Sequence, residues 1–307
     1  MIYQHPLAYL LALEGLALLR AWAGDFDKDF VDRRLADIRQ LLAAEAVAGH
    51  DGVKVIGRDT LTGYRGWAPT YDEPRNGLFD CDEPVMHQIL DAIQSGDALD
   101  AACGTGRYAE YLAGRGHRVV GVDRSPDMLQ RARARVPSGR FILGDLHRLP
   151  MAENSVNLIV SALALCHVPT LAPVMAEFAR VLRPGGHLVI SDVHHEIIIR
   201  GSVPLAPGPN GEPGFITSYR HTPGDYLRAA LPAGLQVRRC EEPLGPDHGF
   251  PPPPPALTEV TVSGWHEWPW SLMGLIPEAA WAAWAVPPTI VWHFELPEPA
   301  CSARESR

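Results

Sequence analysis

A glycine-rich turn bordered by an acid is the first feature of this sequence that could do chemistry. Asp100 is followed within seven residues by Ala102, Gly104 and Gly106. The two glycines let the backbone turn sharply and approach a ligand closely. A helix is expected directly after the turn, and the free N–H groups at a helix N-terminus attract anionic groups. The turn therefore predicts a site for a nucleotide-like small molecule.

The glycine pattern alone leaves two kinds of site open. Gly104, Gly106 and Ala109 also satisfy the loose GxGxxA pattern of nicotinamide dinucleotide sites. Asp100, however, stands four residues before the first glycine, where its carboxylate would repel a pyrophosphate. The same carboxylate would bind the ammonium group of a methionine moiety. This acid therefore favours S-adenosylmethionine (SAM) over a dinucleotide.

Two more acids follow the next two expected strands. Asp123 is suited to accept hydrogen bonds from both ribose hydroxyls, a role that nicotinamide sites share. Asp145, in the run Gly144-Asp145-Leu146, can accept one from the exocyclic amine of adenine. Met128, one turn into the intervening helix, is placed to pack its thioether on the adenine face. Acids at three successive strand ends predict a site for an adenosine that carries a cation.

Regular alternation of apolar strands and amphipathic helices supplies the elements that must position these residues. Strands are expected at 97–101, 117–122, 139–143, 156–162, 186–192, 236–241 and 289–296. Helices are expected at 83–95, 125–135, 171–182 and 222–231, and one more between the glycine turn and Arg115. The alternation predicts an α/β fold with a doubly wound, mostly parallel seven-stranded sheet of the Rossmann type, which binds ligands at the carboxyl ends of its strands.

The remaining sequence divides the chain into three expected segments. Residues 1–50 predict an N-terminal helical extension, with helices at 6–23 and 26–49. Residues 51–195 hold the SAM-binding core, and 196–307 hold its last elements with insertions that form a substrate lid. Five of the eight tryptophans fall in the C-terminal insertion. They would line a pocket for an aromatic or isoprenoid substrate, or bury a lid or a homodimer face.

The run from Asp100 to Asp192 resembles the class I SAM-dependent methyltransferases, particularly the small-molecule branch with the ubiquinone/menaquinone-type enzymes. Asp100 to Gly106 resembles the family's first motif, and Leu182-Arg183-Pro184-Gly185-Gly186 resembles the turn before its fifth strand. Upstream, Tyr64 to Asp72 resembles a segment in which a tyrosine closes over the methionine end of the cofactor. The resemblance implies cofactor contacts from Tyr64, Tyr71, Asp100, Ala102, Gly104, Gly106, Asp123, Arg124, Met128, Asp145, Leu146 and Ser161.

Methyl transfer from a sulfonium is an in-line displacement, to which a protein contributes orientation, exclusion of water and sometimes a base. The candidate bases are His167, after the fourth expected strand, and His194 and His195, after the fifth. His194, His195 and Glu196 could also suggest a metal site. We expect none, because no second group of ligands has suitable spacing.

Composition narrows the partners and the compartment. A net charge of −9 and a pI near 5.8 argue against nucleic acid as a partner. After the fourth expected strand the sequence reads Ser161-Ala162-Leu163-Ala164, which lacks the Asn/Asp-Pro-Pro-aromatic run of enzymes that methylate base amines in nucleic acid. Five scattered cysteines predict reduced thiols in the cytoplasm.

The apolar stretch 7–23 is interrupted by Glu14 and Arg20, so no membrane span is expected. No basic segment precedes it, which argues against a signal peptide. A buried or partner-packed amphipathic helix is the main interpretation, and a helix on a membrane surface the alternative. The sequence thus predicts a cytoplasmic SAM-dependent methyltransferase of a small metabolite. The rival hypotheses are an NAD(P)-dependent oxidoreductase and a non-catalytic SAM-binding protein.

Overall fold

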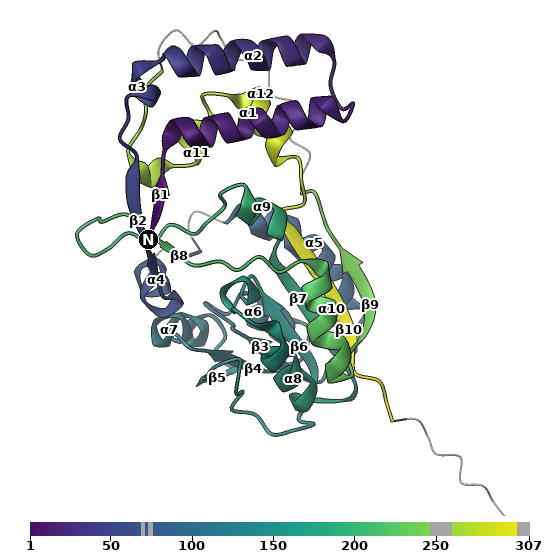
Figure 1. Ribbon diagram of the computed structural model, residues 1–307. Helices are drawn as coiled ribbons and strands as arrows, with labels where there is room; N and C mark the ends of the chain where they lie inside the picture. Colours follow the sequence, from purple (N-terminus) through teal and green to yellow (C-terminus); the bar gives the residue numbers. More distant parts are fainter. Residues whose placement is uncertain (69–70, 73–75, 246–259, 300–307) are drawn as a thin grey trace, which may run out of the picture. The chain divides into compact units, whose positions relative to one another are not determined.

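The computed structural model describes residues 1–68, 71–72, 76–245 and 260–299 (Figure 1). The chain forms two compact units that do not follow the three consecutive segments expected from the sequence. Unit 1 combines three stretches of chain, 1–63, 196–218 and 246–287. Unit 2 comprises 64–195, 219–245 and 288–307. Residues 1–63 therefore pack with two later stretches of the chain. Contacts between residues far apart in the sequence define this unit.

Unit 2 is built on a seven-stranded sheet in the order β5-β4-β3-β6-β7-β10-β9. Its strands are β3 (Asp97–Ala101), β4 (Arg118–Asp123), β5 (Arg140–Leu143), β6 (Val156–Ala162), β7 (Leu182–Val193), β9 (Gln236–Glu241) and β10 (Thr289–Glu295). Strands β5, β4, β3, β6 and β7 pair in parallel, and β10 runs antiparallel to both of its neighbours. The expected doubly wound, mostly parallel sheet is confirmed.

Helices cover both faces of this sheet, because alternate strand residues point to opposite sides. Leu99 belongs to one core, with residues of α8 (Leu171–Val181) and α10 (Pro223–Ala230). Ala98 belongs to the other core, with the helices α5 (Gly77–Asp91), α6 (Arg107–Gly114) and α7 (Pro126–Arg135). Helix α5 begins six residues before the expected start, where Asn76 accepts a hydrogen bond from the backbone N–H of Leu78 as its N-cap.

The winding of the sheet reverses between β3 and β6. From β3 the chain continues outward through β4 and β5, and β6 returns to the other side of β3. Loops that leave two such neighbouring strands in opposite directions open a crevice at their carboxyl ends. Here those loops are residues 102–106 and the segment that contains the 3₁₀ helix η1 (Leu165–His167). The topology therefore places the glycine turn beside this crevice.

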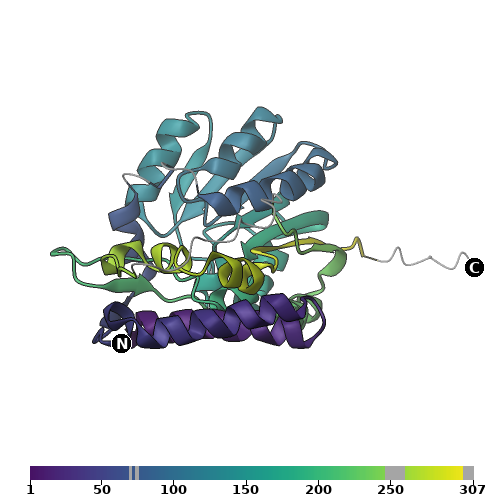
Figure 2. The same cartoon turned by 90° about the horizontal axis from the view of Figure 1, so that it is seen from above.

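Unit 1 has its own helical core and a small sheet. Helix α1 (Pro6–Trp22) packs against α2 (Lys28–Ala43) and α12 (Pro277–Trp284), as Figure 2 lets the reader follow. Asp27 accepts from the N–H of Phe30 and caps α2. The smaller helices are α3 (Glu45–Ala48), α11 (Trp270–Met273) and η3 (Trp265–Glu267). The sheet has the order β1-β2-β8, with β1 (Ile2–Gln4), β2 (Val53–Arg58) and β8 (Gly214–Ile216).

This small sheet was not expected from the sequence. Strands β1 and β8 have three residues each, too few to show a period-two pattern, and β2 pairs in parallel with β8 far along the chain. The three remaining elements are α4 (Thr60–Trp67), α9 (His195–Ile199) and η2 (Leu231–Ala233). Short strands of this kind are recognised through their pairing partners rather than through their own residues.

The tryptophans of the C-terminal insertion mostly pack inside unit 1. Trp268 is 4% exposed, and Trp265, Trp281 and Trp284 lie against the same core, whereas Trp270 is exposed. The segment Pro6–Ala23 is by length and composition apolar enough to cross a membrane, and 28% of it is buried. One such helix near the N-terminus is weak evidence for a span, because core helices meet the same criterion.

Candidate functional site

The glycine turn adopts the left-handed backbone conformation that its sequence predicts. Ala102, Gly104 and Gly106 have φ values of 58°, 52° and 87°. A Cβ added to Gly104 would meet no atom within 4 Å, so this residue borders open space. A Cβ on Gly106 would lie 3.1 Å from the Cβ of Ala132. Gly104 therefore leaves room for a ligand to approach, and Gly106 allows close packing between α6 and α7.

Asp123, the last residue of β4, is held by the turn itself. Its Oδ2 accepts a hydrogen bond from the N–H of Gly104 at 2.9 Å, and its Oδ1 accepts one from the N–H of Ser125 at 2.8 Å. Burial raises the pKa of this carboxyl although these backbone donors oppose the shift. The acid expected to bind ribose is thus oriented beside the open space at Gly104.

Asp100 lies near the end of β3 and is 2% exposed. Its Oδ2 accepts a hydrogen bond from the N–H of Ala109 at 2.8 Å and so fastens the first turn of α6. Burial raises the pKa of Asp100 to about 7, and the nearby charge of Asp123 adds to the increase. This carboxyl changes its charge near neutral pH, and its anchoring role was not foreseen from the sequence.

Asp145 lies in the loop after β5 and is more accessible than the other two acids, with 47% of its side chain exposed. Its Oδ1 accepts from the N–H of His147 at 2.8 Å and lies 2.6 Å from the ring Nδ1 of the same residue. Partial burial raises the pKa of Asp145, but these interactions and the charge of Arg124 outweigh burial and leave the pKa below its usual value. Leu146 packs against the core beneath α8.

Met128 and Ser161 are buried more deeply than their expected contact with the cofactor requires. Met128 in α7 is 2% exposed, and Ser161 in β6 is fully buried. No residue that the structure describes makes a hydrogen bond to the Ser161 hydroxyl. A buried hydroxyl without a partner is uncommon, which makes Ser161 a candidate for a ligand contact. The assignment of both residues to the cofactor stays a prediction.

Tyr64 and His167, predicted for different reasons, are in direct contact. The Tyr64 hydroxyl lies 2.8 Å from Nε2 of His167. The ring centroid of Tyr64 is 5.5 Å from that of Trp67 and 6.0 Å from that of Tyr71. These four side chains form an aromatic cluster contributed by α4, the segment after it and η1. The fold thus brings together a tyrosine and a histidine that lie about one hundred positions apart in the sequence.

Carboxylates at the strand ends face this aromatic cluster. Burial raises the pKa of Tyr64, and the charges of Asp123 and Asp192 raise it further. Asp192, near the end of β7, is fully buried and its Oδ2 accepts a hydrogen bond from the Tyr226 hydroxyl at 2.6 Å. The aromatic cluster therefore lies close to the carboxyl ends of β4 and β7, where the fold predicts a ligand.

The two histidines after β7 are arranged differently from His167. His194 is 3% exposed, and its Nε2 lies 3.0 Å from Oε1 of Glu242. Its ring centroid is 4.4 Å from that of His195, the first residue of α9. No group of three or more His, Cys, Asp and Glu side chains suited to a metal ion occurs among the described residues. Nε2 of His194 is therefore engaged by the Glu242 carboxylate.

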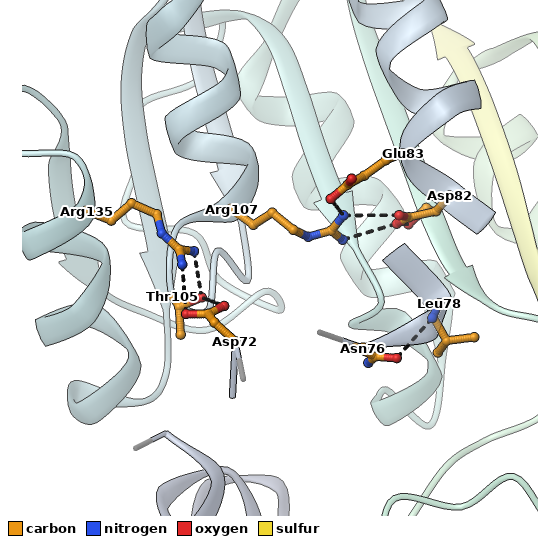
Figure 3. Close-up of polar contacts among 9 residues, drawn as sticks. Asp72, Asn76, Leu78, Asp82, Glu83, Thr105, Arg107 and Arg135 are labelled. Atoms are coloured by element: carbon orange, nitrogen blue, oxygen red, sulfur yellow. Dashed lines mark hydrogen bonds and ion pairs between the residues drawn. The ribbon is translucent and has the colours of Figure 1, made fainter. Parts of the chain in front are cut away.

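Two charged networks that sequence reasoning missed surround the glycine turn (Figure 3). In the first, Oγ1 of Thr105 donates to Oδ1 of Asp72 at 2.9 Å. Arg135, the last residue of α7, donates to Thr105 at 3.0 Å and to Oδ2 of Asp72 at 2.8 Å. Asp72 follows directly after Tyr71 of the aromatic cluster. Asp72, Thr105 and Arg135 thus form a connection, here called the Asp72 latch, between the segment that contains Tyr71 and the glycine turn.

In the second network, Arg107 donates to both carboxylate oxygens of Asp82 at 3.1 and 3.2 Å and to Glu83 at 2.9 Å (Figure 3). Ser191 of β7 donates to the fully buried Asp82 at 2.5 Å. The guanidinium of Arg107 lies 3.9 Å from the ring centroid of Phe79. These contacts join α5, α6 and β7. No sequence signal marked them, since their partners are 24 to 109 residues apart.

Comparison with known proteins agrees with this geometry. Residues 99–190 match the family described as "Methyltransferase domain". A malonyl-[acyl-carrier protein] O-methyltransferase of Hamiltonella defensa is 34% identical over 34% of this chain and 40% of its own length. A demethylmenaquinone methyltransferase of Renibacterium salmoninarum is 35% identical over 48% of this chain and 55% of its own length. The chain thus spans about half or less of the length of these two curated relatives.

A solved structure described as a DhpI–SAH complex is 20% identical to this chain. It aligns with a TM-score of 0.51 over 78% of this chain and 95% of the other. At that identity the likeness shows the fold. The strand order, the glycine turn with its acids and the family match all point to the same conclusion. Residues 99–190 match the methyltransferase family, and the seven-stranded sheet that contains them has the fold of SAM-dependent methyltransferases.

Proposed function

We propose that this chain is an enzyme that transfers a methyl group from SAM to O, N or C of a small organic metabolite. The observation that carries the proposal is the open space at Gly104, bordered by Asp123 at the point where the winding of the sheet reverses. Binding of a nucleoside there needs a close backbone approach and an acid for the ribose hydroxyls. Both are present within hydrogen-bond distance of each other.

In this proposal each of the three acids contacts a different part of the cofactor. Asp123 accepts hydrogen bonds from the ribose hydroxyls, and Asp100 compensates the ammonium charge. Asp145 and Leu146 contact adenine from the loop after β5, and Met128 packs from α7. The raised pKa of Asp100 and its burial support a role with a cation, because a buried carboxylate is stabilised by a neighbouring positive charge.

When bound, SAM supplies a methyl group on a sulfonium, which is already a good leaving group. The chain's contribution is orientation and exclusion of water, for which the aromatic cluster around Tyr64 is suited. Among the three proposed bases His167 has the strongest support, since it bonds to Tyr64 close to Asp192. His194 and His195 stay in the proposal as alternatives for an acceptor that approaches from β7.

We also propose that the protein acts in the cytoplasm on a small molecule and not on nucleic acid, and that it forms a homodimer. The net charge of −9 supports the exclusion of nucleic acid. Trp22 and Leu19 of α1, which are 92% and 66% exposed, support a dimer because large apolar side chains favour burial. Light scattering at several protein concentrations measures the oligomeric state.

Isothermal titration calorimetry of the full chain with SAM, S-adenosylhomocysteine and NADH tests the cofactor. We expect binding of the first two at one site per chain and no binding of NADH. Binding of NADH together with no binding of SAM would contradict the proposal and indicate an NAD(P)-dependent oxidoreductase. Turnover to S-adenosylhomocysteine is then measured with quinone-like phenols and acyl-thioester carboxylates, because similar proteins are named for such substrates. Tight SAM binding with no turnover on a broad metabolite panel would indicate a non-catalytic SAM-binding protein.

A further inference from the structure

Unit 1 contains a pocket of about 300 Å³, a volume at the lower end of the range of small-molecule sites. Its walls come from three stretches of unit 1, at residues 3–9, 201–205 and 268–272. All three lie outside the segment that matches the methyltransferase family. The pocket therefore belongs to the part of the chain that has no assigned role in the reaction.

The walls of this pocket are predominantly aromatic and aliphatic. Trp268 and Leu272 form one side and are 4% and 2% exposed. The indole N–H of Trp268 donates to the carbonyl of Ser263 at 3.2 Å, which leaves the ring as an apolar wall. The ring of Tyr9, which also lines the pocket, lies against Gly201, where an added Cβ would be 3.2 Å from the Tyr9 ring. This wall is therefore close-packed and pre-formed.

Two residues that line the pocket carry a buried polar atom without a hydrogen bond to any residue that the structure describes. These atoms are Nδ1 of His5 and the hydroxyl of Tyr9. Two polar neighbours are already engaged: Oε1 of Gln4 accepts from Trp265 at 2.7 Å, and the Tyr3 hydroxyl donates to the carbonyl of Asp51. A buried polar atom without a partner is energetically unfavourable, because it has lost its hydrogen bonds to water. A ligand group that bonds to Nδ1 would remove this cost.

We propose that this pocket binds a compact, ring-shaped apolar ligand with one hydroxyl or N–H group placed against His5. The aromatic walls favour a planar ring system, and the volume admits one or two fused rings. The unmet nitrogen of His5 accounts for this polar group on the ligand. The ligand is either the methyl acceptor or an effector that does not react, and both share this chemistry. The proposal stands on the geometry of unit 1 and does not require SAM.

The pocket of unit 2 beside Arg107 and Arg135 shows why the pocket of unit 1 is the better candidate. It is larger, about 400 Å³, but its charged walls are already paired. Arg107 is bound by Glu83 and Asp82, and Arg135 by Asp72. A ligand that binds to Arg107 or Arg135 there would compete with existing ion pairs, whereas a ligand in the pocket of unit 1 would bond to a nitrogen that has no partner among the described residues.

Calorimetry and ligand-observed NMR on the full chain with 2-naphthol and naphthalene test the proposal. We expect 2-naphthol to bind at one site per chain about tenfold more tightly than naphthalene. Ala8→Trp, on the exposed side of α1 at the pocket, should weaken 2-naphthol at least tenfold by filling the space, because helical side chains lean toward the N-terminal turn. Ala12→Trp, one turn later on the same helix and also exposed, is the matched control and should change nothing.

His5→Phe keeps a ring of similar size and removes the nitrogen, so the preference for 2-naphthol over naphthalene should disappear. This variant also tests the proposal if Ala8→Trp proves unfolded by circular dichroism. Binding that neither variant changes, or absence of binding by both probes, would overturn the proposal. Incubation with methyl-labelled SAM separates the two sources: label on 2-naphthol supports an acceptor site, and binding without label supports an effector site.

Discussion

Both units bury carboxyl groups, but they surround them in different ways. In unit 2, Asp100 and Asp123 lie at the ends of neighbouring strands and accept hydrogen bonds from backbone N–H groups. In unit 1, Glu14 and Glu278 lie on helices and share the guanidinium of Arg34, which is 2% exposed. Backbone N–H donors orient the two carboxylates of unit 2, whereas a buried cation compensates the two of unit 1. Asp82 of unit 2, which pairs with Arg107, is of the second kind, so the partner of a buried acid is more informative than its burial.

The charge balance of the Arg34 cluster makes it the more sensitive of the two to a single change. Glu14 is fully buried, and its pKa is raised to about 8 by burial, with Asp37 and Glu278 adding to the increase and Arg34 opposing it. One buried cation thus faces three acids. Asp100 and Asp123, by contrast, are positioned by hydrogen bonds from backbone N–H groups.

Arg34→Met is expected to have the largest effect, a loss of about 3 kcal/mol in the free energy of unfolding, because buried acids lose their cation. Urea denaturation followed by circular dichroism measures it. Arg33→Met is the matched control: this neighbour binds the same Glu278 but its side chain is 48% exposed, so its loss should be small. Equal losses in the free energy of unfolding for Arg34→Met and Arg33→Met would contradict the prediction that the buried arginine contributes more to stability than the exposed one.

Asp123→Ala should weaken SAM about 100-fold, because the ribose would lose two charge-assisted hydrogen bonds. Calorimetry gives the dissociation constant, and thermal denaturation checks that the variant is folded. The control is Asp127→Ala, four residues further along, whose carboxylate is 45% exposed and pairs with Arg65 at the surface. Unchanged SAM affinity in Asp123→Ala would remove this acid from the site.

SAM affinity should depend on pH through Asp100, whose pKa is about 7 before the cofactor binds. Below that pH a proton must be lost before the ammonium can be compensated, so affinity should fall by up to about tenfold per pH unit. Above about pH 8 the amino group of SAM itself loses its charge. Calorimetry from pH 5.5 to 9 should show a maximum between these limits. Asp100→Asn, which can still accept from Ala109, should flatten the acidic side of the profile.

The folding stability of unit 1 should decrease as pH rises from about 4.5 to about 8. The pKa of Glu14 is raised in the folded chain, so the folded state binds more protons than the unfolded state in this window. The slope attributable to this one group is at most about 1.4 kcal/mol per pH unit. Urea denaturation at several pH values compares the native chain with Glu14→Gln, whose slope should be smaller. A steeper slope in the variant would reverse the sign of this argument.

The smallest effect is expected at the Asp72 latch. Asp72→Asn weakens a partly exposed ion pair with Arg135, and such pairs contribute about 0.2–1 kcal/mol. SAM should therefore dissociate about two- to fivefold faster, as stopped-flow fluorescence would show. Asp91→Asn breaks the surface pair with Arg115 in the same unit and serves as control. Equal rates of SAM dissociation in both variants would mean that the Asp72 latch does not restrain the glycine turn.

Much of unit 2 could be predicted from the sequence because its signals are local. Each of the seven strands lies within a few residues of its expected position, since apolar runs and intervening helices repeat at short range. The glycine turn was predictable because Gly104 and Gly106 adopt left-handed φ angles, which glycine reaches without a steric penalty. Asp100, Asp123 and Asp145 were predicted as candidate site residues from their positions at or just after the ends of three strands.

Tertiary structure alone decided the rest. The Asp72 latch joins residues that are 33 and 63 positions apart. The sequence shows that these residues are charged or polar but not which residues they pair with. The same holds for unit 1, whose small sheet and pocket are assembled from three separate stretches of chain. Local sequence determined the strands and most helices of unit 2, because periodicity and backbone preference act over a few residues. Packing determined which side chains meet, because burial and ion pairing act through space.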